Sequence, residues 1–519
     1  MPLAPLRGRL RALTRAAGWG NLIRPLLGGA FSGAVFRGAA GTALSRVVGL
    51  GREVALAHVF GASAALDAFF IAYFVPNLLR RLLGEGGMAA AFLPLYVQAG
   101  DEGAPFARAT LRILIVVLVP ICALGAVLAP VYIPALAAGF PRGKLTLAVS
   151  LARWTFPFLA MASFSALAGA ILNAHGRFFL PAVAPSAWSL GLIAGALLVS
   201  RLVSPPVLGL AVGLLLGGAG MVAVQAPAAW PHLRGAGRAS PGDLVALGRR
   251  LLPVLGGLAV AEMNLLVDNR LASYLADGSV ATLQYAMRLF QLPLGILAVS
   301  VATAALPRLS AYAAAGREQG FRQALGKGVA LGAALLLPAT FGLLVLRKPV
   351  VQLLFQHGAF TAADTARTAA ALAAYLAGLW GYGLVYLFSR AFYALGRPGI
   401  PVLTAAVAVG VNVGLDLAWV GPWGTFGLAL ATGMAGWVDA LLQGAALWRW
   451  GGGWIPWRAV GAAGLAALGM GALLWGLDRL ALAGLAPWGR VLLGVPAGLL
   501  LYLSLGRLVG LQRALKGAG

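Results

Sequence analysis

Long apolar runs recur along the chain, and they restrict it to a narrow class of folds. Of its 519 residues, 61% are hydrophobic and only 10% are charged, whereas an average soluble domain has about 25% charged residues. Each run extends over about 20 residues or more, which is the length an α-helix needs to cross a bilayer. Transmembrane β-barrels have shorter segments of alternating hydrophobicity. The sequence therefore predicts an all-α polytopic membrane protein.

The apolar runs predict about fourteen transmembrane helices. Their approximate ranges are 32–60, 65–99, 108–137, 146–173, 179–202, 205–230, 248–275, 279–313, 325–346, 364–394, 399–420, 424–448, 457–478 and 486–508. Proline and glycine should break several of them, with a kink at Pro76 and a second break at Pro293 and Gly295.

Two pairs of similar short segments, with nearly the same separation along the chain, indicate an internal repeat. The segment "GRFFLP" at 176–181 returns as "GRPGIP" at 396–401, and the segment at 66–76 resembles the one at 283–293. Duplicated lobes are common in transporters, which bind substrate between them. We therefore expect two pseudo-symmetric six-helix lobes with a C-terminal helix pair. The expected parts are a basic N-terminal extension 1–31, an N-lobe 32–230, a C-lobe 248–450, a helix pair 457–508 and a cytoplasmic tail 509–519.

The positive charge of the chain is distributed as in a membrane protein. The formal net charge is +25, and most Lys and Arg residues outside the expected helices fall on one side of the membrane. The positive-inside rule places that side, with both termini, in the cytoplasm. Because the position of the charges explains them, we do not expect nucleic acid as a partner. The single Cys122 cannot form an intrachain disulfide.

Several charged side chains fall inside the predicted helices. The stretch "ALSRVVGLGREVALAHVFG" at 43–61 places Arg46, Arg52 and Glu53 near the middle of an apolar segment. A charge at the bilayer centre costs about 2.5–3.5 kcal/mol on insertion scales, so such residues usually face a cavity or a pathway. With Arg80 and Arg288, these arginines predict a water-filled cationic cavity between the lobes. Guanidinium groups suit phosphate, so the expected substrate carries phosphate or carboxylate.

A second polar group lies in the C-lobe and is acidic. Asn412 and Asp416 are one helical turn apart, Thr432 lies on the next helix, and Asp268 lies on an earlier one. Hard oxygen ligands with net negative charge suit Na⁺ or a proton. The alternative is structural, with a contact between Asn412 and Asp416 and a surface pair between Asp268 and Arg270.

Several motifs closely resemble those of a known family. The segment "LSRVVGLGREVALAHVFGASAALDAFFIAYFVPNLLRRLLGEGGMAAAFLPLY" at 44–96 resembles the N-terminal signature of the MurJ (MviN) family of lipid II flippases. That family belongs to the multidrug/oligosaccharidyl-lipid/polysaccharide exporter superfamily. Further matches are "LNAHGRFFLPAVAP" at 172–185, "YAMRLFQLPLGILAVSVATAALPRLS" at 285–310, "LLFQHGAFT" at 353–361 and "FYALGRPGIP" at 392–401.

The resemblance implies functional positions, which we name by their numbers in this chain. The residues matching family positions that bind substrate or control gating are Ser45, Arg46, Arg52, Glu53, Asp67, Asn77, Arg80, Glu85 and Arg288. Glu53 stands where the family usually has Asp. A sodium site of the family corresponds to Asp268, Asn412, Asp416, Thr432 and the backbone carbonyl of Leu428. The family also implies that the helix pair 457–508 offers a groove for a lipid tail.

Together these features predict a transporter and not an enzyme. We expect the chain to flip lipid II from the inner to the outer leaflet of the bacterial cytoplasmic membrane by alternating access. Arginines would bind the pyrophosphate, and the membrane potential or a cation gradient would supply the driving force. Membrane lipids and cell-wall synthesis proteins are further expected partners, and Na⁺ is a possible coupling ion.

Alternative functions fit parts of the same pattern. One is an exporter of drugs or of another undecaprenyl-linked glycan in the same superfamily, although drug exporters for cations favour acidic, aromatic cavities. Others are a membrane-embedded enzyme acting on polyprenyl substrates and a scaffold of the cell-wall machinery. The sequence shows no P-loop and no HExxH motif, so it indicates neither an ATPase nor a metalloprotease.

Overall fold

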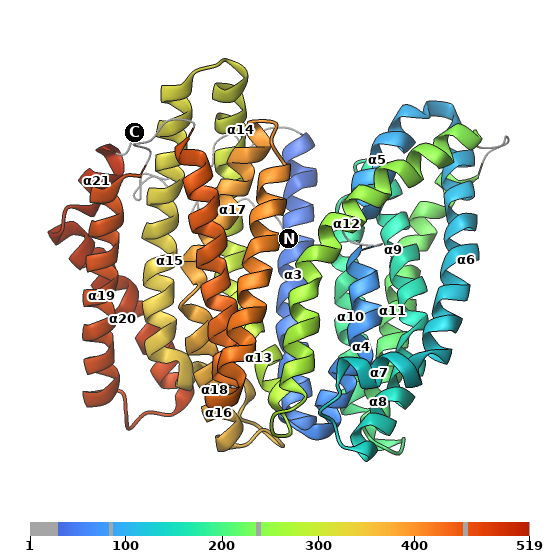
Figure 1. The fold of residues 1–519 in the computed structure, drawn as a ribbon, viewed down its shortest axis with the longest axis horizontal. Helices are drawn as coiled ribbons and strands as arrows, with labels where there is room; N and C mark the ends of the chain where they lie inside the picture. The colour runs from blue at the N-terminus through green and yellow to red at the C-terminus, as the bar shows by residue number, and fades with distance from the viewer. Residues whose placement is uncertain (1–29, 83–86, 235–239, 450–454, 518–519) are drawn as a thin grey trace, which may run out of the picture. The chain divides into compact units, whose positions relative to one another are not determined.

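The computed structural model describes residues 30–82, 87–234, 240–449 and 455–517 (Figure 1). Within these ranges the secondary structure is helical and contains no strand, which confirms the predicted all-α class. Nine helices of this described part are long and apolar enough to cross a membrane. The number is ten if the bent pair α16 (Ala362–Leu376) and α17 (Leu379–Ala394) counts as one span. The chain is therefore a multi-pass membrane protein.

The helices of the first half follow the predicted ranges closely. They are α3 (Ala30–Phe60), α4 (Ala64–Arg80), α5 (Gly87–Gln98), α6 (Gly103–Val127), α7 (Ala129–Leu136), α8 (Arg142–Thr155), α9 (Pro157–Ala174), α10 (Phe179–Leu197) and α11 (Leu208–Ala229). The second half continues with α12 (Pro241–Ala272), α13 (Ser279–Pro293), α14 (Val299–Ala314), α15 (Glu318–Phe355), α16, α17, α18 (Gly399–Trp448), α19 (Trp457–Leu480), α20 (Pro487–Leu508) and α21 (Leu511–Gly517).

Of the two predicted proline positions, Pro293 ends α13, whereas Pro76 lies inside the continuous helix α4. The predicted helix 279–313 is interrupted by a short π-helical turn, Leu294–Ala298, directly after Pro293. Gly424 has φ 53° and ψ −131° inside α18, so this long helix consists of two helical parts. These parts correspond to the predicted ranges 399–420 and 424–448. The predicted range 65–99 is divided into α4 and α5, and residues 83–86 between them lie outside the described part.

The chain forms two compact units, which we describe separately. Unit 1 contains residues 1–52, 76–125 and 155–255, and unit 2 contains 53–75, 126–154 and 256–519. The division passes through α3, α4 and α6. It therefore differs from the lobes expected from the repeat, because residues 53–75 and 126–154 pack with the second half of the chain. The two repeat-based lobes stay a prediction.

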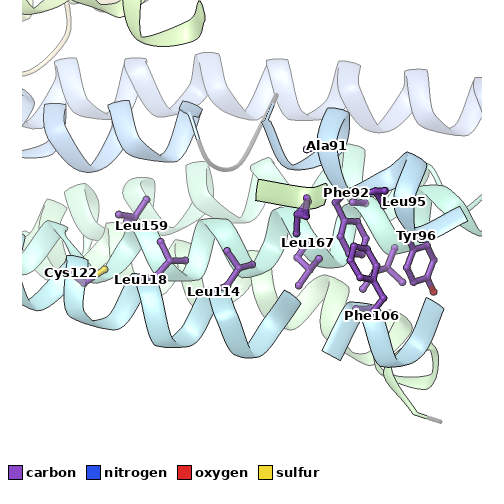
Figure 2. Packing of buried hydrophobic residues seen from close by; sticks show 14 residues of the cluster. Ala91, Phe92, Leu95, Tyr96, Phe106, Leu114, Leu118, Cys122, Leu159 and Leu167 are labelled. Carbon is purple, nitrogen blue, oxygen red and sulfur yellow. The ribbon is translucent and has the colours of Figure 1, made fainter. Parts of the chain in front are cut away.

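An apolar core holds α5, α6 and α9 of unit 1 together (Figure 2). The ring of Phe92 on α5 stacks on Phe106 of α6 with centroids 5.3 Å apart, and on Tyr96 at the same distance. Leu114 and Leu118 of α6 continue the cluster along the helix. Offset-stacked aromatic pairs of this kind contribute about 0.5–1.5 kcal/mol beyond their buried area.

A glycine seam joins α10 and α11 in unit 1. A Cβ atom on Gly213 would lie 2.4 Å from the carbonyl oxygen of Gly191, and one on Gly195 would lie 2.5 Å from that of Gly209. A Cβ atom on Gly217 would lie 2.7 Å from Cα of Trp188. Small residues four apart let helix backbones approach closely in membranes, where van der Waals packing drives association. The seam therefore fixes α10 firmly against α11.

Unit 2 is organised around α15, which packs against α14, α16, α17, α19 and α20 (Figure 1). Ala333 and Ala334 of α15 share one buried apolar cluster with Ala463 and Ala467 of α19. The Tyr502 hydroxyl of α20 donates a hydrogen bond of 2.8 Å to the Ala334 carbonyl. Asp478 of α19 and Arg490 of α20 form an ion pair that links the last two long helices.

The glycine seam gives a first testable prediction. We expect Gly213→Ala to lower the free energy of unfolding by about 1–3 kcal/mol, because the added methyl group meets backbone that no rotamer change can move. The matched control is Gly464→Ala in α19, where an added Cβ meets nothing within 4 Å. Helix propensity should make that control neutral or stabilising by up to about 1 kcal/mol. Unfolding in detergent measures both, and equal stability of the two variants would contradict the seam.

Candidate functional site

Arg52 is the intramembrane arginine that the structure places in the interior of unit 1. Its side chain is 6% exposed, and Nη1 lies 3.5 Å from Oγ of Ser189, the long limit for a hydrogen bond. The guanidinium carbon lies 4.4 Å from the centre of the Trp188 ring. A Cβ atom on Gly49 would lie 3.9 Å from the same Ser189 hydroxyl. Gly49 and Arg52, three residues apart on one helix face, therefore both face α10.

Arg80 of α4 approaches the same tryptophan. Its Nε and Nη2 donate hydrogen bonds of 3.1 and 2.9 Å to Oδ1 of Asn77, one turn earlier. The guanidinium carbon lies 5.3 Å from the centre of the Trp188 ring, and the side chain is 7% exposed. Three of the predicted positions, Arg52, Asn77 and Arg80, are thus brought together in unit 1.

Trp188, whose ring both arginines contact, was not predicted from the sequence. Trp188 lies on α10 in the motif "SAWSLG", between the buried Ser186 and Ser189. An aromatic residue in an apolar helix usually belongs to the core, so nothing in its spacing distinguishes it. The two flanking serines are a signal, because polar residues on both sides of a tryptophan indicate a helix face that is not purely apolar. Helical periodicity places Ser186 and Ser189 on one face.

Other predicted positions on α3 have separate surroundings. In unit 2 the Glu53 carboxylate is 4% exposed and lies 3.3 Å from Nε of Arg288. Ser45 is half-buried and Arg46 is exposed. Glu85 lies outside the described residues. Glu53 therefore pairs with an intramembrane arginine of unit 2.

Asp67 is held in a buried ion network of unit 2. Its side chain is 1% exposed and accepts a hydrogen bond of 2.8 Å from Lys144 Nζ. It also accepts from the backbone N–H groups of Gly278 at 2.7 Å and Ala281 at 2.8 Å. These groups lie at the N-terminus of α13, where the helix dipole favours a negative charge. Lys144 also bridges to Asp277 at 2.7 Å. Asp67 thus connects α4 and α8 to the start of α13.

The turn between α3 and α4 makes a backbone contact beside this network. Gly61 has φ 59°, and a Cβ atom there would lie 2.5 Å from the Ala359 carbonyl oxygen. Gly278 has φ 84°, and a Cβ atom there would lie 1.9 Å from the carbonyl oxygen of Ala62. The Ala359 N–H donates to the His58 carbonyl at 2.8 Å. Both glycines are required by conformation and by close approach.

The acidic group expected in the second half is brought together in unit 2. Asp268 lies beside Asp416 and Thr432, and the Thr432 hydroxyl donates 3.1 Å to the carbonyl oxygen of Leu428. Asn412 and Asp416 are 0% exposed. Within the described residues, no donor group hydrogen-bonds to the Asp416 oxygens or to Oδ1 of Asp268, which face each other, and the Asn412 amide has no partner. The alternative, a surface pair of Asp268 with Arg270, is not among the ion pairs of the described residues, where Arg270 donates to the Ala135 carbonyl.

These unsatisfied oxygens fit a monovalent cation. Buried polar atoms without a partner cost free energy, so a set of them in one place is suited to binding a polar or charged ligand. The carboxylates, the amide, the hydroxyl and the carbonyl are all hard oxygen ligands. Across the described part of the chain, no group of three or more His, Cys, Asp and Glu side chains could hold a metal ion. The donor set therefore suits Na⁺ better than a transition metal.

Comparison with known proteins now identifies the family. The family model described as "Lipid II flippase MurJ" matches residues 56–480. The chain belongs to the MurJ family. The "Probable lipid II flippase MurJ" of Vibrio cholerae is 34% identical over 504 residues, covering 91% of this chain and 96% of that protein. The protein of the same description from Thermotoga maritima is 33% identical, covering 76% and 81%. This family is a family of flippases and not of enzymes.

Solved structures agree with this assignment. The structure described as "Lipid II flippase MurJ, inward closed conformation" matches with a TM-score of 0.79 and 27% identity, covering 91% of this chain and 98% of that one. An inward-facing multidrug resistance MATE family transporter of the MOP superfamily matches with a TM-score of 0.67 and 17% identity, covering 80% and 98%. That second likeness shows a shared fold. The predicted family is therefore confirmed.

The buried ion network gives a second prediction. Asp67 and Asp277 both contact Lys144, but the Asp67 side chain is 1% exposed and that of Asp277 is 64% exposed. We expect Asp67→Asn to cost about 3–5 kcal/mol of unfolding free energy, since it breaks a buried ion pair. Asp277→Asn should cost less than about 1 kcal/mol because solvent screens an exposed pair. Unfolding of both variants in detergent tests this difference, and equal costs would refute it.

Proposed function

We propose that this chain flips lipid II from the inner to the outer leaflet of a bacterial cytoplasmic membrane. Membership of the MurJ family supports this activity, since the curated relatives are described as lipid II flippases. The proposed mechanism rests on one observation: the buried guanidinium groups of Arg52 and Arg80 both contact the indole ring of Trp188 in unit 1.

The proposed role of these arginines follows from the chemistry of the substrate. Lipid II has a pyrophosphate, a large polar head and a polyprenyl tail, and the head cannot cross hydrocarbon unaided. Guanidinium groups keep their charge at any physiological pH and bind phosphate through several N–H donors. In this proposal Arg52 and Arg80 bind the pyrophosphate during translocation, and Asn77 keeps Arg80 oriented.

Two ion pairs of unit 2 are proposed to control the cycle. Glu53 holds Arg288 in place when substrate is absent, and the pyrophosphate competes for that arginine. The network of Asp67, Lys144 and the α13 N-terminus stabilises one state of the alternating-access cycle. A ligand shifts such a cycle only by binding one state better than the other.

The proposal includes a membrane topology for the chain. In it, the chain has fourteen transmembrane helices in two pseudo-symmetric six-helix lobes, with both termini in the cytoplasm. α19 and α20 offer the polyprenyl tail a path along the lipid. The length of α18, 50 residues with a break at Gly424, supports two spans there, because one helix of that length would far exceed the bilayer thickness.

Translocation can be measured in bacterial cells depleted of their own lipid II flippase and supplied with this chain. An externally added enzyme that cleaves lipid II reports the fraction that has reached the outer leaflet. We expect the wild type to restore cleavage. Arg52→Ala and Arg288→Ala should each reduce it at least roughly tenfold, because charge-assisted hydrogen bonds are worth about 1.5–3 kcal/mol.

A matched control comes from another arginine ion pair. Arg322 lies 3.1 Å from Glu318, one turn apart on the exposed face of α15, and Arg322→Ala should leave cleavage unchanged. Quantified membrane insertion must be equal for all variants. Full activity in both Arg52→Ala and Arg288→Ala would overturn the arginine mechanism, and inactivity of an inserted wild type would favour another undecaprenyl-linked substrate.

We further propose that Na⁺ binds at Asp268, Asn412, Asp416, Thr432 and the Leu428 carbonyl and helps to drive the cycle. The buried oxygens without a protein partner support this site. Bound Na⁺ would supply positive charge beside two carboxylates. The membrane potential would add about 2.3 kcal/mol for each charge moved through 100 mV.

The sodium site gives a prediction that is independent of transport. At Na⁺ concentrations one hundredfold above Kd, we expect the wild type to gain about 2.7 kcal/mol of stability over the same concentration of K⁺. Asp416→Asn should abolish this difference. Asp439→Asn should retain it, because the Asp439 carboxylate, also buried, already accepts a hydrogen bond of 3.0 Å from Gln443. Equal stabilisation by both salts, or its survival in Asp416→Asn, would refute the site.

A further inference from the structure

We propose that Trp188 is a positioning residue that holds Arg52 and Arg80 as a pair, so that together they bind a diphosphate group. The inference rests on the proposed function, since it concerns the same arginines. Trp188 belongs to α10, whereas Arg52 and Arg80 come from α3 and α4. One indole ring thus joins three helices of unit 1 at the point where two positive charges are buried.

The contact distances indicate a shared aromatic platform. The guanidinium carbons lie 4.4 Å (Arg52) and 5.3 Å (Arg80) from the centre of the Trp188 ring. Both values are within the range of about 6 Å in which a cation is attracted to the negative face of an aromatic ring, and tryptophan has the strongest such attraction. The attraction strengthens when the groups are removed from water, and both arginine side chains are buried.

The aromatic contact lowers the cost of placing two positive charges close together. Two arginines brought together for a diphosphate repel each other, and the repulsion increases in a low dielectric. An indole ring attracts the cations through its face and has no hydrogen-bond acceptor. Trp188 can therefore favour the pair without competing with phosphate oxygens for hydrogen bonds.

The platform itself is rigid. The α10 backbone at Trp188 is locked against α11, because a Cβ atom on Gly217 would lie 2.7 Å from both Cα and the carbonyl oxygen of Trp188. The Phe158 ring of α9 lies 6.0 Å from the indole. The next residue, Ser189, contacts Arg52 from the same helix. A ring held in this way fixes the guanidinium positions, and such preorganisation raises affinity by lowering the ordering cost of binding.

The geometry also points to selectivity between ligands. A diphosphate can engage two guanidinium groups at once, whereas a monophosphate has only one phosphorus centre to place between them. If the ring sets the spacing of the pair, its removal should weaken diphosphate binding more than monophosphate binding. This difference separates a positioning role from simple packing, because a packing defect would weaken both ligands equally.

The test uses the full chain in lipid nanodiscs, with farnesyl diphosphate and farnesyl monophosphate as probes and calorimetry as the readout. We expect Trp188→Leu to weaken diphosphate binding roughly tenfold and to change monophosphate binding less. Trp188→Phe keeps an aromatic face and should stay within about threefold of the wild type. Trp188→Met is a second non-aromatic variant that keeps more of the buried volume.

The control is Tyr393→Leu in α17, which removes the aromatic ring 5.8 Å from the Arg390 guanidinium and should bind both probes as the wild type does. Arg52→Ala separates the two proposals. If Arg52→Ala loses diphosphate binding and the non-aromatic Trp188 variants retain it, only the role of Trp188 is overturned. If Arg52→Ala binds as well as the wild type, the arginine mechanism fails. Equal weakening of both probes in Trp188→Leu, Trp188→Met and Trp188→Phe would assign the ring to packing and overturn the inference.

Discussion

A charge inside a bilayer must be stabilised from within the protein, and the described parts of this chain do so in distinct ways. Arg52 and Arg80 contact the face of an indole ring in unit 1. Arg288 pairs with Glu53, and Asp67 combines a lysine with two backbone N–H groups at a helix start. Each solution recruits groups from helices far apart in the chain. Helix packing and charge placement therefore depend on each other.

The helical class and most helix ranges were predictable because they depend on local properties. The length of each apolar run determines the extent of a transmembrane helix. Pro293 interrupts its helix where expected. Helical spacing also places Gly49 and Arg52 on one face of their helix, and the structure shows that this face meets α10. The acidic group around Asp416 was predicted from its residue types. The resemblance to the family added the expectation that these positions bind a cation.

The remaining features depend on tertiary contacts, which the spacing of residues along the sequence does not determine. Trp188 looks like an ordinary core residue until α3 and α4 bring arginines to it. Lys144 precedes the predicted helix 146–173, and nothing in its position indicates that its side chain is only 6% exposed between two aspartates. Residues 53–75 and 126–154 belong to the first half by sequence but pack with the second. Such contacts arise between segments more than 70 positions apart.

The turn at Gly61 and Ala62 contacts Gly278 and Ala359 through backbone atoms. Glycine and alanine have no side-chain rotamers to lose, so joining these surfaces carries almost no side-chain entropy cost. A junction of this composition brings two turns to backbone distance, so its closeness depends on the absence of a side chain at Gly61 and Gly278.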